Sequence, residues 1–152
     1  MTTALRIALY QPDIAGNVGA VMRTCACLEI ALDLIEPMGF QWDDKRVARA
    51  AMDYIDHVAL TRHGDWDAFA AQATGRLVLS TTRGATPLHD FAFRPDDILL
   101  FGRESAGVPE SVHDRADARV VIPMVPALRS MNLSVSAAIV AAEALRQTGG
   151  WP

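Results

Sequence analysis

Short apolar runs alternate with helical patterns along the whole chain, and this alternation restricts the fold more than any other feature of the sequence. Buried strands are predicted at residues 5–10, 31–35, 76–80, 97–101 and 119–122, with a weaker candidate at 57–61. Helical patterns fall at residues 16–28, 43–52, 66–73 and 132–146, with a helical turn near 109–112. Because buried strands joined by helices form parallel sheets, we predict an α/β domain with a mainly parallel sheet, helices on both faces and a ligand site at the carboxyl ends of the strands.

The size and composition of the chain are typical of one globular domain. Its 152 residues are enough to bury a core, and a single domain is placed over residues 1–152 because no linker or repeat interrupts them. Hydrophobic residues make up 51% and charged residues 21%, which excludes the disordered class. No apolar run has the length of a membrane span and the N-terminus carries no signal-peptide pattern, so we expect a cytoplasmic protein.

The net charge of −4 argues against nucleic-acid binding through the overall field of the protein. The type and position of the basic side chains favour nucleic-acid binding more than the net charge does. Of the 14 basic residues only Lys45 is a lysine, and the others are arginines, which suit bidentate phosphate contacts. Several of them lie in predicted loops or at the ends of elements: Arg23, Arg83, Arg103 and Arg129. A local basic face is therefore compatible with the sequence.

Three strands of the second half each end in a loop of polar and glycine residues. These loops cover residues 80–84, 102–107 and 122–132. If their strands are neighbours in the sheet, the loops form one pocket rich in backbone donors and acceptors. The third loop opens a long Ala-rich helical pattern. Its small polar residues have two interpretations, an ordinary helix cap or a ligand-binding loop.

Common motifs of nucleotide and hydrolase chemistry are absent. The first strand is followed by QPDIAGNVG, which is not a dinucleotide fingerprint, and the chain has neither a P-loop nor a G-x-S-x-G elbow. The histidines are scattered without ligand spacing, and Cys25 and Cys27 point to different faces of a helix, so no metal site is expected. The remaining arginine, asparagine, glutamate, serine and glycine residues suit a polar, nucleoside-like ligand and an incoming phosphate or hydroxyl.

Three segments, each following a predicted strand, resemble the SPOUT class of RNA methyltransferases in its TrmH-like branch, which methylates ribose 2′-hydroxyl groups. The first is Asn17-x-Gly19-x-x-x-Arg23, and the second is FGRESAGVP at residues 101–109. The third is IPM at residues 122–124 followed by RSMNLSVS at residues 129–136. Further segments at residues 35–40, 42–46 and 53–54 are similar to the members that modify the wobble nucleotide of tRNA, so the resemblance covers nearly the full chain.

This resemblance implies a deep trefoil knot at the C-terminus, a homodimer, and S-adenosyl-L-methionine as the cofactor. It implies a methyltransferase acting on the ribose of nucleotide 34 (cytidine or 5-carboxymethylaminomethyluridine, in leucine tRNAs), with the anticodon arm of tRNA as partner and no metal. The run at residues 42–49 is interpreted as a surface helix, with tRNA contact as the alternative. The cofactor-binding positions that it implies are Ser80, Thr81, Gly102, Glu104, Ile122, Met124, Ser130 and Leu133.

The same resemblance implies a catalytic set of Arg23, Asn17, Glu104, Ser130 and Asn132. A ribose 2′-hydroxyl has to lose its proton as it attacks a sulfonium methyl, and alignment with that methyl can supply much of the rate. Because a guanidinium stays protonated at neutral pH, it is a poor base. We interpret Arg23 as a clamp on phosphate and ribose that passes the proton to an RNA phosphate, with direct base action as the alternative.

Other functions stay open at the level of the sequence. The same fold could act at another tRNA or rRNA position, or could bind RNA without catalysis. Loss of Arg23 or of the segment at residues 130–132 would indicate the noncatalytic class, and both are present. The third class is a flavodoxin-like domain that binds a small molecule.

Overall fold

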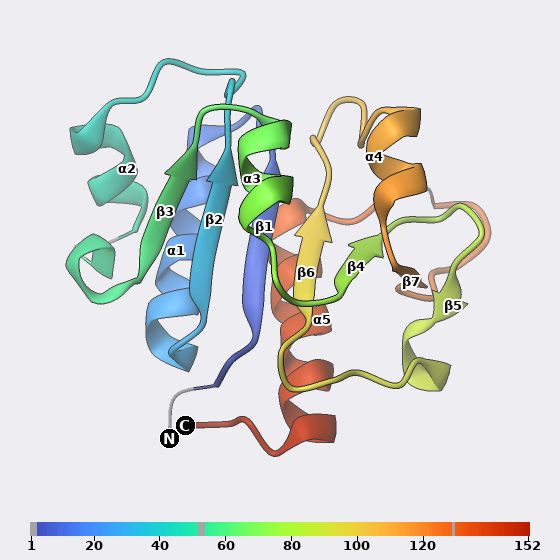
Figure 1. The fold of residues 1–152 in the computed structure, drawn as a ribbon. Coiled ribbons are helices and arrows are strands. Elements are labelled where there is room, and N and C mark those ends of the chain that lie inside the picture. The colour runs from blue at the N-terminus through green and yellow to red at the C-terminus, as the bar shows by residue number, and fades with distance from the viewer. Residues whose placement is uncertain (1–2, 52–53, 129) are drawn as a thin grey trace.

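A seven-stranded sheet forms the centre of the computed structural model, which describes residues 3–51, 54–128 and 130–152 (Figure 1). The order across the sheet is β3-β2-β1-β6-β4-β7-β5, and every neighbouring pair is parallel. The strands are β1 (Arg6–Tyr10), β2 (Ala31–Ile35), β3 (Leu60–His63), β4 (Leu77–Ser80), β5 (Thr86–Pro87), β6 (Ile98–Phe101) and β7 (Ala118–Val121).

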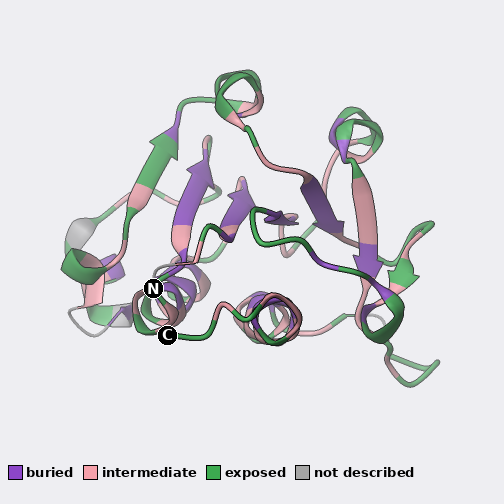
Figure 2. Cartoon of the chain, turned by 60° about the horizontal axis from the view of Figure 1, so that its bottom comes forward, coloured by how far each residue is buried: buried purple, intermediate pink, exposed green. Residues whose placement is uncertain are grey.

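Helices cover both faces of the sheet, as predicted. Figure 2 shows α1 and α5 below the sheet and the shorter α3 and α4 above it. The helices are α1 (Ala15–Leu28), α2 (Asp44–Ala50), α3 (Trp66–Gln72), α4 (Glu110–Arg115) and α5 (Leu133–Thr148), with 3-10 turns η1 (Tyr54–His57) and η2 (Leu88–Asp90). The α/β architecture with a parallel sheet is therefore confirmed.

The side chains of the central strands alternate between two apolar layers. Ile7 and Leu9 of β1 pack into the layer under α1 and α5, while Ala8 and Tyr10 pack into the layer under α3 and α4. Strands buried on both faces have continuous apolar sequences, which is why β1 is recognisable without a period of two. Each fully buried Leu or Ile of this kind contributes about 2 kcal/mol to folding. A rigid sheet results, and its carboxyl ends can position loops.

The strands β6, β4 and β7, which precede the three polar loops, are direct neighbours. Ser80 at the end of β4 is in register with Phe101 of β6 on one side and with Val120 of β7 on the other. Parallel strands in register end at the same edge of the sheet, so their loops emerge together. The condition under which the three loops form one pocket is therefore met.

The third strand of the chain differs from its prediction. Residues 57–61 are only a weaker candidate in the sequence, and the structure has η1 at Tyr54–His57 and β3 at Leu60–His63. The inward residue at the end of β3 is His63, which is 6% exposed and bonded to buried Asp33 at 2.9 Å. An apolar pattern cannot detect a strand whose buried contact is polar. Strand β5 was not predicted, because two residues are too short to carry a pattern.

The C-terminal knot stays a prediction from the resemblance. Within the described chain, Gln147 near the end of α5 accepts a hydrogen bond from Phe93 N and donates one to the Phe91 carbonyl, each at 2.8 Å. Helix α5 is thereby fastened to the segment that connects β4 with β6. No helix in the described part of the chain has the length and apolar character needed to cross a membrane. Met52, in the predicted second helix, lies outside the described residues.

Candidate active site

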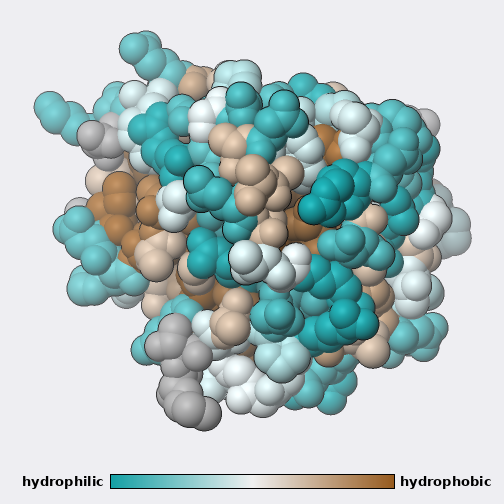
Figure 3. Space-filling view, in the orientation of Figure 1, coloured by the Kyte–Doolittle hydropathy of each residue, from teal (hydrophilic) through white to brown (hydrophobic). Residues whose placement is uncertain are grey.

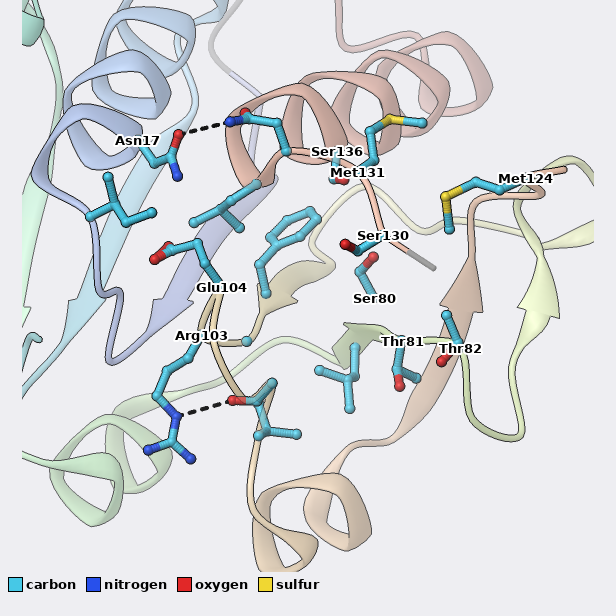
Figure 4. Close-up of a pocket in the computed structure, with 18 residues that line it drawn as sticks. Asn17, Ser80, Thr81, Thr82, Arg103, Glu104, Met124, Ser130, Met131 and Ser136 are labelled. Atoms are coloured by element: carbon cyan, nitrogen blue, oxygen red, sulfur yellow. Dashed lines mark hydrogen bonds between the residues drawn. The ribbon is translucent and has the colours of Figure 1, made fainter. Parts of the chain in front are cut away.

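A cavity of about 490 Å³ opens at the carboxyl ends of β6 and β4 (Figure 4). It lies where the loops after β4, β6 and β7 meet the first turns of α1 and α5. The predicted site residues that line it are Asn17, Ser80, Thr81, Gly102, Glu104, Met124, Ser130, Asn132 and Leu133. The pocket expected from the three loops is therefore present, while the roles of its residues stay predictions.

Several lining residues were not in the predicted set. Most of them belong to the same three segments and differ from their predicted neighbours only by one or two positions. Ile14 carried no signal in the sequence, since it lies before the first helix as an isolated apolar residue. The additional lining residues are Ile14, Leu79, Thr82, Phe101, Arg103, Gly107, Val108, Met131 and Ser136.

Two predicted site residues do not line the cavity. Arg23 lies in the middle of α1 with an exposed side chain, its guanidinium carbon 5.5 Å from the ring centre of Tyr54. Ile122, just after β7, packs against the apolar layer under α1 and α5. Arg129 and Asp53, which belong to the segments of the resemblance, lie outside the described residues.

The loop after β6 is held in a tight shape by its backbone. Arg103 N donates to the Gly107 carbonyl at 3.0 Å, and Gly107 N donates back to the Arg103 carbonyl at 2.9 Å. A Cβ on Gly102 would lie 2.7 Å from the Gly107 carbonyl carbon, so the two backbones approach more closely than any side chain permits. Gly107 has φ +63°, a conformation that favours glycine. Both glycines are therefore required by geometry.

The Arg103 side chain fastens this loop to the end of β1. Its Nε donates to the Gly107 carbonyl at 3.2 Å, and its Nη1 donates to Gln11 Oε1 at 3.4 Å. The guanidinium carbon lies 5.5 Å from the centre of the Tyr10 ring. Figure 4 shows the guanidinium pointing away from the cavity. Arg103 thus borders the cavity, while its guanidinium stabilises the loop after β6 and the end of β1.

The Glu104 carboxylate lies beside the start of α1. Its Oε2 accepts a 2.8 Å hydrogen bond from Asp13 N. Its Oε1 is buried and has no hydrogen-bond partner among the described residues. Burial raises the pKa of Glu104, while hydrogen bonds from the backbone of Asp13 and Ile14 oppose this. A buried acceptor without a partner is costly, so Glu104 is suited to a ligand that donates a hydrogen bond.

Asp13 closes the connection between the loops after β1 and β6. Its Oδ2 accepts from Ser105 N at 3.0 Å and also from the Ser105 hydroxyl. Gly39, in the loop after β2, lies under this carboxylate, since a Cβ there would be 2.6 Å from Asp13 Oδ1. Asp13 and Ser105 therefore fix the position of Glu104 between them.

Asn132 organises the other side of the cavity as the N-cap of α5. Its Oδ1 accepts from Ser134 N at 2.9 Å and from Val135 N at 3.2 Å. Its Nδ2 donates to Asn17 Oδ1 on α1 at 3.1 Å. The two interpretations of the loop at residues 122–132 are therefore compatible, because a helix cap also borders the cavity. The N-termini of α1 and α5 meet there, and both favour anionic groups.

The cavity lining combines hydroxyls, an acceptor without a partner and apolar walls. Among the described residues, one group of three side chains has the spacing to hold a cation: Glu110, His113 and Asp114. It lies on α4 outside the cavity, and Glu110 is already bound by Arg83 at 2.9 Å. The arrangement at the sheet edge is suited to a nucleoside-like ligand.

Known proteins resemble this chain over nearly its whole length. A model of the SpoU rRNA Methylase family matches residues 4–142. A tRNA (cytidine(34)-2′-O)-methyltransferase of Beijerinckia indica is 57% identical over 146 residues, which are 94% of this chain and 91% of that protein.

Two solved structures have the same fold. One, which concerns the 2-OH methylation of C/U34 on tRNA, matches with a TM-score of 0.88 and 41% identity over 94% of this chain and 95% of that one. The other is the SpoU methyltransferase AviRb from Streptomyces viridochromogenes in complex with the cofactor AdoMet. It matches with a TM-score of 0.83 and 25% identity over 97% of this chain and 62% of its own.

Proposed function

This chain belongs to the SpoU rRNA methylase family, and on that premise we propose that it methylates the ribose 2′-hydroxyl of nucleotide 34 in tRNA. Relatives that match it nearly end to end carry that activity in their names. The observation that carries the proposal is the cavity, where three loops distant in sequence and the first turns of α1 and α5 bring nine of the predicted site residues together. Sequence similarity and geometry thus support the same reaction.

S-adenosyl-L-methionine fits this cavity and is its cofactor. The volume of about 490 Å³ falls in the range of roughly 300–1,000 Å³ that ligand pockets occupy. Glu104 Oε1 offers a buried acceptor to an amino or hydroxyl donor, and Phe101 and Leu79 offer apolar contact to a base. When bound, the cofactor supplies a methyl group on a positively charged sulfur. The chain holds it with the residues of the three loops.

The target hydroxyl has to be aligned and has to lose its proton. Ser130, Asn132 and Asn17 line the cavity between α1 and α5, where they can orient a ribose by hydrogen bonds. Arg23 acts as a clamp on the ribose and its phosphate, and the proton passes to that phosphate. Alignment of this kind can supply much of the rate of a methyl transfer.

The active unit is a homodimer in this proposal, with Arg23 contributed across the interface. Arg23 does not line the cavity of its own chain, which supports an arrangement in which a second copy brings it there. Large apolar side chains are exposed around the cavity, including Ile14 at 50% and Leu128 at 62%, and a second copy would bury them. Mixing an Arg23→Lys variant with a Glu104→Gln variant tests this. Recovery of about a quarter of the wild-type activity supports an arginine acting across subunits, since half the dimers are mixed and one site in each is intact.

Residues 1–152 act as one domain in this proposal, so the anticodon arm is read by the domain surface. Recognition then relies on phosphate contacts and on a base turned out of the anticodon loop. We accordingly propose that the reaction takes place in the cytoplasm. The nucleotide expected at position 34 is cytidine or 5-carboxymethylaminomethyluridine, in leucine tRNAs.

Nucleoside mass spectrometry tests the proposed reaction. Purified tRNA lacking the modification is incubated with the protein and the cofactor, digested and analysed for 2′-O-methylated nucleosides at position 34. Formation of 2′-O-methylcytidine or its uridine counterpart is expected. No change in any 2′-O-methylated nucleoside would overturn the enzyme assignment, and binding of a flavin without binding of S-adenosylmethionine would indicate the flavodoxin-like alternative.

A further inference from the structure

We propose that the solvent face of α2 binds the phosphate backbone of the substrate RNA outside the cavity. The face is defined by Lys45, Arg46 and Arg49 and is called the α2 basic face. The proposal rests on the proposed function, because it names the surface that holds the same tRNA. It concerns binding rather than chemistry, and so it can fail while the methylation assignment stands.

The cations of this face form no ion pair with the described residues, in contrast to many other cations of the described chain. Lys45, Arg46 and Arg49 are exposed, and none of them forms an ion pair with any described residue. Elsewhere in the described chain, the arginines that form ion pairs include Arg6, Arg62, Arg76, Arg83, Arg115 and Arg146. The α2 basic face thus concentrates positive charge on a protein whose net charge is −4. That charge is available to an external anion.

The helix itself keeps the three cations together on its solvent side. Val47 and Ala51 are buried, which fixes the opposite side of the helix against α1. Arg49 lies four positions after Lys45 and three after Arg46, so the side chains are neighbours on the helix surface. Like charges at this spacing repel each other and weaken a helix. A cluster that disfavours its own helix indicates a role in binding an anion.

A carboxylate next to this face is engaged by the helix end. Asp43 is the N-cap of α2, and its Oδ1 accepts from Lys45 N at 2.9 Å and from Arg46 N at 3.4 Å. Its charge therefore stabilises the positive end of the helix dipole. Asp43 thus binds the backbone of α2 rather than the side-chain cations of the α2 basic face.

The α2 basic face lies beside the residue that the family resemblance makes catalytic. Helix α2 packs against α1, and Arg23 of α1 lies over the ring of Tyr54 in η1, the element that follows α2. The loop that leads into α2 is also fastened to the cavity side, since Gly39 N donates to the Pro12 carbonyl at 2.9 Å, next to Asp13. Figure 1 shows α2 at the outer edge beyond β3, and Figure 3 shows hydrophilic side chains projecting from that edge. An RNA strand held by Arg23 would pass along this face.

The surface offers charge rather than base stacking. Trp42, just before α2, has its ring covered by Arg62, whose guanidinium carbon is 4.4 Å from the ring centre. Arg62 is in turn held by Glu36 at 2.7 Å. Because one face of its ring is covered by Arg62 and its side chain packs against the apolar layer under α1 and α5, this tryptophan is poorly placed to stack on an unpaired base. We therefore expect phosphate contacts, which strengthen binding on any sequence and depend strongly on salt.

The test is the affinity for tRNA as a function of salt. The triple variant Lys45→Gln, Arg46→Gln, Arg49→Gln is compared with wild type and with Arg94→Gln, which removes an exposed arginine that forms no ion pair with a described residue. Fluorescence anisotropy measures tRNA affinity, and calorimetry measures affinity for S-adenosylmethionine. We expect the triple variant to bind tRNA about 10-fold more weakly at 0.1 M salt, with a salt slope smaller by about 2. Cofactor affinity and the control variant should match wild type.

The outcomes distinguish failure of the proposed RNA-binding face from failure of the proposed methylation. The triple variant could keep the tRNA affinity and the salt slope of wild type while wild type methylates tRNA. In that case the proposal for the α2 basic face is wrong and the proposed function stands. If wild type binds no tRNA, both are overturned. The charge-reversal variant Arg49→Glu provides a second measurement with a single change. It should weaken tRNA binding more than Arg94→Glu does, and equal effects of the two would also contradict the proposal.

Discussion

The side-chain amide of Asn132 donates a 3.1 Å hydrogen bond to the side-chain oxygen of Asn17, a residue 115 positions earlier in the chain. The bond joins the first turn of α1 to the N-cap of α5 across the mouth of the cavity. The oxygen of the same Asn132 side chain caps α5 by accepting from Ser134 N and Val135 N. One residue thus both caps α5 and joins it to α1 beside the cavity.

The two tasks of Asn132 can be separated by substitution. The Asn132→Asp variant would keep the capping oxygen, since aspartate caps helices as well as asparagine, but would offer Asn17 no N–H. We expect stability to fall by at most about 1 kcal/mol, the value of one lost hydrogen bond, and S-adenosylmethionine affinity to weaken by about fivefold because α1 and α5 are no longer joined beside the cavity. Asn132→Ala loses the cap as well, so its stability should fall by about 1 kcal/mol more. Thermal denaturation and calorimetry measure both, and wild-type affinity in the aspartate variant would contradict the role of the Asn17 bond.

Substitution of Arg23 by lysine tests its proposed role as a clamp. Lysine keeps the charge but loses the planar fork that binds a phosphate in a bidentate manner. Misalignment of the target hydroxyl should lower turnover about 100-fold, while cofactor affinity stays unchanged because Arg23 does not line the cavity. Single-turnover methylation and calorimetry measure the two quantities, with Arg94→Lys as the control. Near-normal turnover with unchanged tRNA affinity would show that the fork geometry is not needed.

Glu104 makes the stability of the ligand-free protein depend on pH in a predictable direction. Burial raises its pKa in the folded state above the ordinary value of 4.5, so folding favours the protonated form. The contribution of this group to stability is therefore greatest below its ordinary pKa and is lost as the pH rises through the raised value. The melting temperature of wild type minus that of Glu104→Gln should increase as the pH falls from 7 to 5. A difference that shrinks over this range would contradict the raised pKa.

The sequence was sufficient to predict the sheet edge on which the site lies. Apolar runs identified β4, β6 and β7, and the topology of parallel strands required their loops to emerge on one side. Ser80 is the last residue of β4, Gly102 follows β6 directly and Met124 lies three positions after β7, so their positions at the cavity depend mainly on local sequence and strand ends. Local sequence was therefore enough to predict which loops border the cavity.

Contacts between distant segments were beyond the reach of sequence patterns. The location of Arg23 outside the cavity depends on how α1 lies across the sheet, which no spacing records. The misplaced third strand has a similar cause. Asp33 is buried at 3% exposure because Arg6 Nε and Nη2 bind it at 2.8 and 3.0 Å, with His63 as a further partner. In a hydrophobicity pattern, the buried polar residues of this three-strand network cannot be distinguished from exposed surface residues.

Two arginine–carboxylate pairs of similar geometry should differ greatly in their effect on stability. Asp97 is fully buried, and its oxygens accept from Arg76 Nε at 2.9 Å and Nη2 at 2.8 Å. Arg146 binds Glu143 at 2.6 Å on the surface of α5, with the arginine side chain 69% exposed. Arg76→Met would leave a buried carboxylate without its cation, which costs about 3–5 kcal/mol, whereas Arg146→Met should change stability little because solvent screens that pair.

Urea denaturation of both variants measures this contrast. A double variant, Arg76→Met with Asp97→Asn, removes the buried charge together with its partner. We expect it to be more stable than Arg76→Met alone, because an amide is less costly to bury than an unpaired carboxylate. Equal losses for Arg76→Met and Arg146→Met, or a double variant weaker than Arg76→Met, would contradict the assignment of the Arg76–Asp97 pair as a buried support of the sheet.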